Sequence, residues 1–204
     1  VYSGGLNIYA TIDTKVQNAL DEVWANADNF PNTEKYGEIP QSAMVITDKQ
    51  GNIVGIAGGR GEKTSSRGFS YASDARRQPG SSIKPVAVYA PALQRSFDLQ
   101  AAGETFPLVD NGFDQQGTNL WGDYITTASI VDDEPTRING KYWPVNSYRS
   151  YRGLYTFRTA LQQSVNVCAV KILAQVGVDY AFDIAERFGL TTLSRRPSGL
   201  RKTR

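Results

Sequence analysis

Two short polar motifs carry the side chains best suited to nucleophilic chemistry. In the first motif, Ser81 and Lys84 follow Pro79-Gly80 and are three positions apart. On a helix this spacing places both side chains on one face, with Cβ atoms about 5–6 Å apart. A neutral lysine there could take the proton of the serine hydroxyl and so activate it. Because a free lysine is almost wholly protonated at pH 7, burial or nearby positive charge must lower its pKa.

The second motif, Ser164-Val165-Asn166, interrupts two amphipathic runs. A serine hydroxyl at this place could relay a proton to or from Lys84 or a leaving amine. The Asn166 amide could accept a hydrogen bond from Lys84 and donate one to a substrate carbonyl. Taken alone, each motif is better explained as helix capping or an inter-helix turn. A Ser-x-x-Lys match arises by chance on the order of once in a chain of this length.

The composition excludes several alternative chemistries. The chain has no histidine and one cysteine, Cys168. It therefore has no Ser-His-Asp triad, Cys-His pair, His-ligated metal, internal disulfide or cysteine-based zinc site. Cys168 falls on an apolar helical face and is expected to be buried and inert. The acidic run Asp132-Asp133-Glu134 is expected to be a solvated turn rather than a cation site.

The elements that must position these motifs follow from length and periodicity. With 204 residues, 40% of them hydrophobic, the chain can build one domain with a sizeable core. Strands followed by helices, without βαβ alternation, predict an α+β fold. Gly177 and Gly189 are placed to end helices. The patterns predict strands at 4–11, 42–48 and 52–57 with a turn at Gly51, helices at 13–26, 81–94, 154–163, 167–176 and 179–188, and irregular structure with short strands over 95–150.

In this order and context the two motifs resemble those of the transpeptidase domain of bifunctional (class A) penicillin-binding proteins. The resemblance extends over about residues 4–193. It implies the penicillin-binding protein/serine β-lactamase fold, a helical lobe with an antiparallel sheet. The segments that carry it are 4–13, Ala43 to Gly59, Arg76 to Ser81, Trp143-Pro144-Val145-Asn146, Tyr151-Arg152-Gly153 and Ala160 to Lys171.

The resemblance also implies a mechanism and roles for the motif residues. Ser81 would be the acylated nucleophile, Lys84 its general base, Ser164 a proton relay, and Asn166 the residue that positions the donor peptide. The reaction would cross-link peptidoglycan stem peptides through D-Ala–D-Ala cleavage, and penicillin would acylate the same serine. No metal or organic cofactor is implied. The parent would be anchored at the outer face of the bacterial cytoplasmic membrane, with a glycosyltransferase domain upstream.

The sequence departs from the family pattern at its C-terminal end. The third motif, Lys-Thr-Gly, is missing, and Lys202-Thr203-Arg204 lacks its glycine. We therefore expect 1–193 to be a partial transpeptidase domain with an incomplete sheet, and 194–204 a basic tail unlike the family. Five of the 22 basic residues lie in that tail, which leaves 17 against 20 acidic ones elsewhere. Nucleic-acid binding is not supported, since the basic pI comes from the tail.

Three other functions stay open at this point. A serine β-lactamase would share the chemistry but hydrolyse the acyl-enzyme, and the class A-like flanking sequence argues against it. A β-lactam sensor would be acylated in the same way but would signal through a membrane partner. A non-catalytic fragment or scaffold would keep the helical lobe alone, and the missing third motif makes this alternative a serious one for this polypeptide, though not for its parent.

Overall fold

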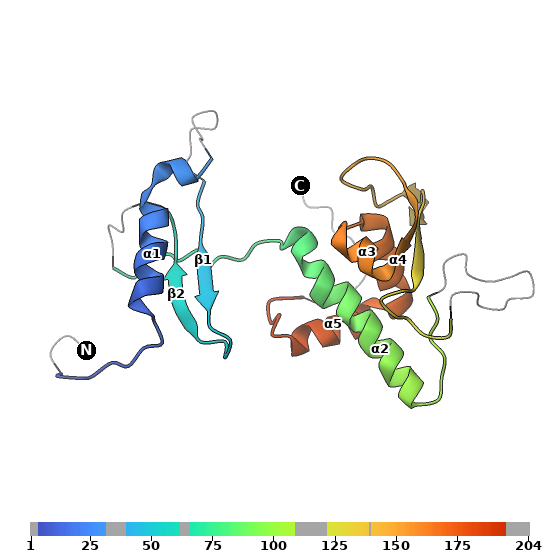
Figure 1. Cartoon of the computed structure of the whole chain (residues 1–204), viewed down its shortest axis with the longest axis horizontal. Helices are drawn as coiled ribbons and strands as arrows, with labels where there is room; N and C mark the ends of the chain where they lie inside the picture. Colours follow the sequence, from blue (N-terminus) through green and yellow to red (C-terminus); the bar gives the residue numbers. More distant parts are fainter. Residues whose placement is uncertain (1–3, 32–39, 62–65, 109–121, 139, 195–204) are drawn as a thin grey trace, which may run out of the picture. The chain divides into compact units, whose positions relative to one another are not determined.

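The computed structural model describes residues 4–31, 40–61, 66–108, 122–138 and 140–194 (Figure 1). The chain divides into two compact units, Val1–Arg77 and Gln78–Arg204, and both sequence motifs lie in the second. The tail residues 195–204, including Lys202-Thr203-Arg204, lie outside the described residues. None of the helices in the described ranges is long and apolar enough to cross a membrane.

The first unit is a helix packed on a hairpin. Helix α1 (Thr14–Ala25) begins at Asp13, whose carboxylate accepts from the Lys15 and Val16 N–H groups, as an N-cap should. A single 3-10 turn, η1 (Ala27–Asn29), follows it. Strands β1 (Met44–Thr47) and β2 (Ile53–Ala57) pair antiparallel and confirm the predicted hairpin.

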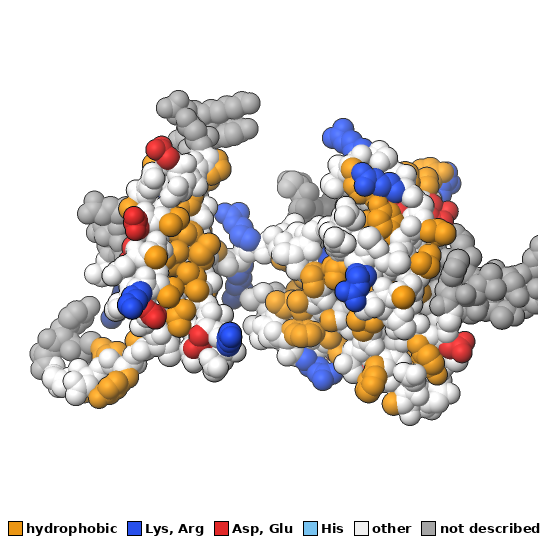
Figure 2. All heavy atoms as spheres, viewed as in Figure 1, with side chains coloured by type: hydrophobic (Ala, Val, Ile, Leu, Met, Phe, Trp, Pro, Cys, Tyr) orange, Lys and Arg blue, Asp and Glu red, His pale blue; other side chains and the backbone are white. Residues whose placement is uncertain are grey.

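Two details of this unit concern the predicted strands. Gly51 has φ 86° in the hairpin turn, a conformation that favours glycine. The strand predicted at 4–11 is wrong, because its described residues form no strand. Hydrogen bonds join the end of this segment and the residue before α1 to β2: Thr11 Oγ1 donates to Ile53 O, and Asp13 N donates to Val54 O. The surface of this unit also carries hydrophobic side chains (Figure 2). An apolar groove between α1 and β1 is lined by Val16, Ala19, Leu20, Val23, Trp24, Met44 and Ile46.

The second unit is built around one helical run whose pitch changes. It begins as a 3-10 turn, η3 (Gly80–Ile83), widens to a π-helical turn, η4 (Pro85–Tyr89), and continues as α2 (Ala90–Ala101). The run starts where the 81–94 helix was predicted but continues for two further turns. Helices α3 (Phe157–Gln162), α4 (Asn166–Val176) and α5 (Val178–Arg187) complete the helical part. Gly177 and Gly189 have φ of 88° and 89° at the ends of α4 and α5, as predicted.

Short antiparallel strands flank these helices. Strand β3 (Ile130–Asp133) pairs with β6 (Gly153–Thr156), and β4 (Arg137–Ile138) pairs with β5 (Lys141–Tyr142). Residues 154–156 were predicted to be helical but belong to β6, since their backbone pairs with β3. With helices and small antiparallel sheets, the fold is α+β. The main core lies among η4, α2, β3, α3, α4 and α5, with Ala92, Val131, Phe157, Ala160, Val165 and Ile172 buried in it.

Candidate active site

Ser81 lies in the first turn of the long helical run. Gly80, with φ 59°, turns the chain into η3, and a Cβ at this glycine would meet no atom within 4 Å. The Lys84 N–H donates to Ser81 O, and in a 3-10 turn the side chains at i and i+3 eclipse each other. Pro85 has no N–H to continue this pattern, and the Ala90 N–H closes the wider π turn by donating to Pro85 O.

The two adjacent serines of the first motif differ in their hydrogen bonds. Ser82 Oγ donates to Pro79 O at 2.6 Å and so stabilises the turn. Ser81 is exposed, and its hydroxyl makes no hydrogen bond with any described residue. The direct bond to Lys84 that the spacing suggested is therefore absent from the described contacts. Catalytic hydrogen bonds are often loose before a substrate binds.

Lys84 is buried, with 8% of its surface exposed, and its amine is directed at the second motif. Lys84 Nζ donates to Ser164 O at 2.7 Å, to Ser164 Oγ at 3.2 Å and to Asn166 Oδ1 at 2.6 Å. An ammonium has three protons to donate, and here three acceptors receive them. Within the described ranges, no carboxylate forms an ion pair with it.

Burial changes the acidity of this lysine. Desolvation disfavours the charged ammonium and holds the pKa of Lys84 below its ordinary value, while the nearby Cys168 thiol acts in the opposite direction. The three acceptors also favour the charged form, but no full negative charge supports them. A larger fraction of Lys84 is therefore neutral at a given pH than for a solvated lysine. Cys168 is fully buried, as predicted.

Ser164 occupies the turn between α3 and α4 in a strained conformation. Its N–H donates to Leu161 O and the Val165 N–H donates to Ala160 O, both at 2.9 Å. This pair of bonds is a Schellman motif, which places its left-handed residue, most often glycine, at position 164. Ser164 has φ 52°, a region that costs a non-glycine residue roughly 1–2 kcal/mol. The turn directs both Ser164 oxygens at Lys84.

Asn166 begins α4 and is held from two sides. Its Oδ1 accepts from Lys84, as expected, and its Nδ2 donates to Val145 O at 2.8 Å. One proton of this amide group remains available for another acceptor. The structure therefore brings Lys84, Ser164 and Asn166 into one hydrogen-bonded cluster, with Ser81 one helical turn from Lys84.

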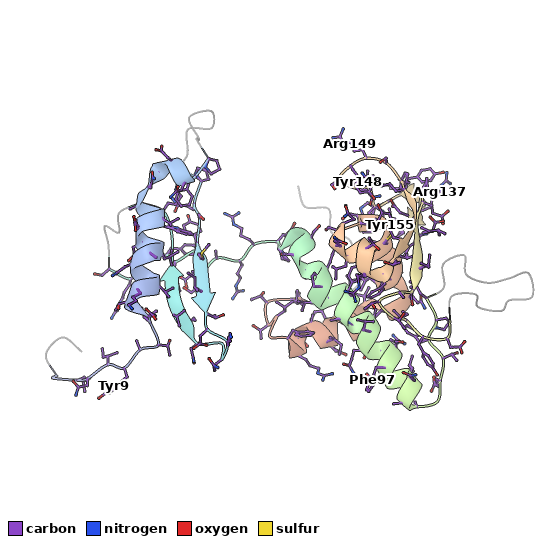
Figure 3. All side chains as sticks on the ribbon, in the orientation of Figure 1. Tyr9, Phe97, Arg137, Tyr148, Arg149 and Tyr155 are labelled. Atoms are coloured by element: carbon purple, nitrogen blue, oxygen red, sulfur yellow. The ribbon has the colours of Figure 1, made fainter. Side chains whose placement is uncertain are left out.

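The sequence reading missed a buried polar network behind this cluster. Asp133, expected in a solvated turn, lies on β3 with 1% of its surface exposed. Its carboxylate accepts from Asn146, from Tyr148 and from the Arg152 N–H. Figure 3 labels Tyr148 in the connection between β5 and β6 and Tyr155 on β6. The sequence offered one indication of this network, because Asn146 lies in one of the segments that resemble the family.

Within the acidic run, Glu134 meets the expectation of a solvated side chain. Glu134 is exposed, and its Oε1 pairs with Lys171 Nζ at 3.0 Å. Tyr155 packs against the hydrophobic core, whereas Tyr148 is engaged with Asp133. Burial and the Asp133 hydrogen bond raise the pKa of Tyr148. In the described part of the chain, no group of three or more His, Cys, Asp or Glu side chains could hold a metal ion.

Curated proteins similar to this chain include several penicillin-binding proteins. Penicillin-binding protein 1A of Clostridium tetani is 32% identical over 193 residues, which is 92% of this chain and 22% of the relative. Penicillin-binding protein 1A/1B of Bacillus subtilis is 33% identical over 188 residues, or 91% of this chain and 17% of the relative. The chain thus spans about a fifth of the length of these curated relatives. No protein-family model matches it.

A solved structure shows the same fold. PonA1 of Mycobacterium tuberculosis in complex with penicillin V matches with a TM-score of 0.63 and 22% identity, over 95% of this chain and 42% of that chain. At 22% identity, this match shows that the two folds are alike. The similarity in sequence is to the curated relatives. The chain is therefore a homologue of part of the class A penicillin-binding proteins, with the fold of their transpeptidase domain.

Proposed function

We propose that this chain carries the acyl-transfer centre of a peptidoglycan D,D-transpeptidase. The observation that carries the proposal is an exposed serine hydroxyl without a partner among the described residues, one helical turn from a buried lysine that Ser164 and Asn166 hold. Ser81 is the nucleophile and Lys84 its base. The substrate is the D-Ala–D-Ala end of a stem peptide, and penicillin acylates the same hydroxyl.

The proton inventory of Lys84 supports these roles. As a neutral amine, Lys84 keeps two N–H bonds and gains a lone pair. The two short hydrogen bonds, to Ser164 O and Asn166 Oδ1, can persist in the neutral amine. The longer bond to Ser164 Oγ, at 3.2 Å, is then lost. The lone pair can then accept a proton from Ser81, or a hydrogen bond from the Ser164 hydroxyl. Ser164 is thereby placed to pass a proton between Lys84 and a leaving amine.

The reaction proceeds in two balanced steps. Ser81 Oγ loses its proton to Lys84 and forms a bond to the penultimate D-Ala carbonyl carbon. The C–N bond then breaks, and the terminal D-Ala leaves after its amine takes a proton through Ser164. In the second step the amine of another stem peptide attacks the ester and loses a proton, and Ser81 Oγ is released as a hydroxyl. Asn166 directs its free amide proton at the donor peptide.

The wider setting forms part of the same proposal. Stem peptides and β-lactams are the partners, and the reaction takes place at the outer face of the bacterial cytoplasmic membrane. The longer protein would also carry a membrane anchor and a glycosyltransferase domain, as the resemblance to class A penicillin-binding proteins implies.

The test is covalent labelling of the full chain with a fluorescent penicillin, followed by intact mass and peptide mapping. Ser81→Ala should abolish the adduct. Ser82→Ala is the matched control, because its hydroxyl is bound to Pro79 O, and it should keep the adduct. A stable adduct on Ser81 supports the transpeptidase. An adduct that hydrolyses rapidly indicates a β-lactamase. A folded chain that forms no adduct would refute the proposal and leave a scaffold.

A further inference from the structure

A buried pair of polar side chains lies behind the second motif. Asp133 is 1% exposed and Asn146 is 2% exposed. Asn146 Nδ2 donates to Asp133 Oδ1 at 2.7 Å and to Ser150 O at 3.0 Å. Asp133 Oδ2 accepts from Tyr148 Oη at 2.7 Å and from Arg152 N at 3.0 Å. Burying a carboxylate is costly unless it is hydrogen-bonded, and both oxygens of Asp133 have donors.

The other end of the Asn146 amide faces α4. Asn146 Oδ1 accepts from Asn166 N at 3.0 Å and from Val167 N at 3.3 Å. The first N–H groups of a helix have no partner within it, and the residue before α4, Val165, has no side chain that could cap them. Asn146 therefore supplies the cap from 20 residues away. Its donor side is bound to Asp133, so its acceptor side is directed at α4.

We propose that Asn146, oriented by Asp133, is a positioning residue for the acyl-transfer centre. It fixes the backbone of Asn166, and so keeps Asn166 Oδ1 at 2.6 Å from Lys84 Nζ. The preceding residue, Val145, holds the Asn166 side chain through its carbonyl. The segment 145–146 thus holds both the backbone and the amide of Asn166. The inference rests on the proposed function for its catalytic meaning, while the contact chain from Asp133 to Lys84 does not depend on it.

The effect of this chain of contacts is measurable at Lys84. Asn166 Oδ1 is the closest acceptor of the Lys84 amine, and an acceptor stabilises the ammonium form. Removal of the Asn146 amide releases the start of α4 and loosens that acceptor. In the described part of the chain, the titratable group that acts on Lys84 is the Cys168 thiol on α4. Without Asn146 the ammonium is less well held, so its pKa falls further.

The experiment is an NMR titration of the full chain labelled with ¹³C at lysine Cε. The Lys84 signal is assigned by its loss in Lys84→Arg. In Asn146→Ala the Lys84 pKa should fall by about one unit, a tenfold loss in proton affinity.

A control separates positioning from general destabilisation. Asp98→Ala removes hydrogen bonds from Gln94 and Tyr180 in the same unit and should leave the Lys84 pKa unchanged. In penicillin acylation the pH midpoint should move to lower pH in Asn146→Ala, together with the titration. A structural role alone would lower the amount of active protein without moving that midpoint.

Two outcomes would overturn the inference. One is an unchanged Lys84 pKa in folded Asn146→Ala, and the other is an equal shift in Asp98→Ala. If Asn146→Ala does not fold, Tyr148→Phe removes one donor to Asp133 and should give a smaller shift in the same direction. No shift in Tyr148→Phe would then overturn the inference. Failure of the wild-type chain to acylate would refute the proposed function instead, since the titration requires no reaction.

Discussion

Replacement of Lys84 by methionine isolates the role of its amine. Lys84→Met keeps an unbranched side chain in the buried position and removes the three hydrogen bonds to Ser164 and Asn166. A positioned general base contributes about 10²–10⁴-fold to a rate, or about 3–5 kcal/mol of barrier. We expect the second-order rate of penicillin acylation at Ser81 to fall by that factor. The chain should still unfold cooperatively, because burial of an ammonium is no longer required.

The pH dependence of acylation gives the same prediction a second readout. The acylation rate of the wild-type chain should rise with pH as Lys84 loses its proton. Because burial lowers the Lys84 pKa, the midpoint should lie below 10.5, the ordinary value. For the same reason Lys84 makes the chain more stable as pH rises from its folded pKa toward 10.5, since the unfolded state then binds more protons. Both slopes should be absent in Lys84→Met.

Lys171→Met provides the matched comparison. Lys171 is a half-buried lysine of the same unit, and its amine donates to Asp132 O and Glu134 Oε1, both at 3.0 Å. Its replacement removes comparable contacts, and acylation should stay within about twofold of wild type, a barrier change of less than about 0.5 kcal/mol. Stopped-flow fluorescence with a labelled penicillin measures both variants. Equal losses in the two variants, or wild-type rates in Lys84→Met, would refute the assignment of Lys84 as base.

Three further changes test the local structure. Gly80→Ala places a side chain at φ 59° and should cost roughly 1–2 kcal/mol in denaturant unfolding while slowing acylation. Asp13→Ala removes the cap of α1 and should lower the stability of the first unit by about 0.5–2 kcal/mol; an equal loss of acylation rate would contradict the placement of the whole centre in the second unit. Burial and the Asp98 bond raise the pKa of Tyr180 to about 12, so stability should fall as pH rises from the ordinary tyrosine value toward 12, and Tyr180→Phe should flatten that fall in a pH series of thermal melts.

Features set by local sequence were predictable. The 44–57 hairpin follows from alternation and a glycine turn, and α1 begins at a capping aspartate. The positive φ of Gly177 and Gly189 follows from their places after apolar periodic runs. The one-turn spacing of Ser81 and Lys84 was also visible, because it depends only on helical geometry.

Features set by distant partners were not predictable. Residues 154–156 look helical, but their backbone pairs with β3 more than 20 positions earlier. The sequence indicates a surface position for Asp133, because the hydrogen bonds that Asn146 and Tyr148 donate to its buried carboxylate come from residues 13 and 15 positions away. The π-helical turn that begins at Pro85 rotates the faces of the following helix. A prediction from the periodicity of a regular α-helix assumes a constant pitch and therefore misses this rotation.

The left-handed backbone of Ser164 sets stability against activity at one position. Glycine at 164 would keep the Schellman turn and relieve the strain of φ 52°, yet it would remove the hydroxyl that faces Lys84. A search that selects variants of this chain for heat resistance alone would therefore favour glycine there and discard the proposed proton relay. Retaining serine is a compromise in which the folded state is less stable than its backbone allows.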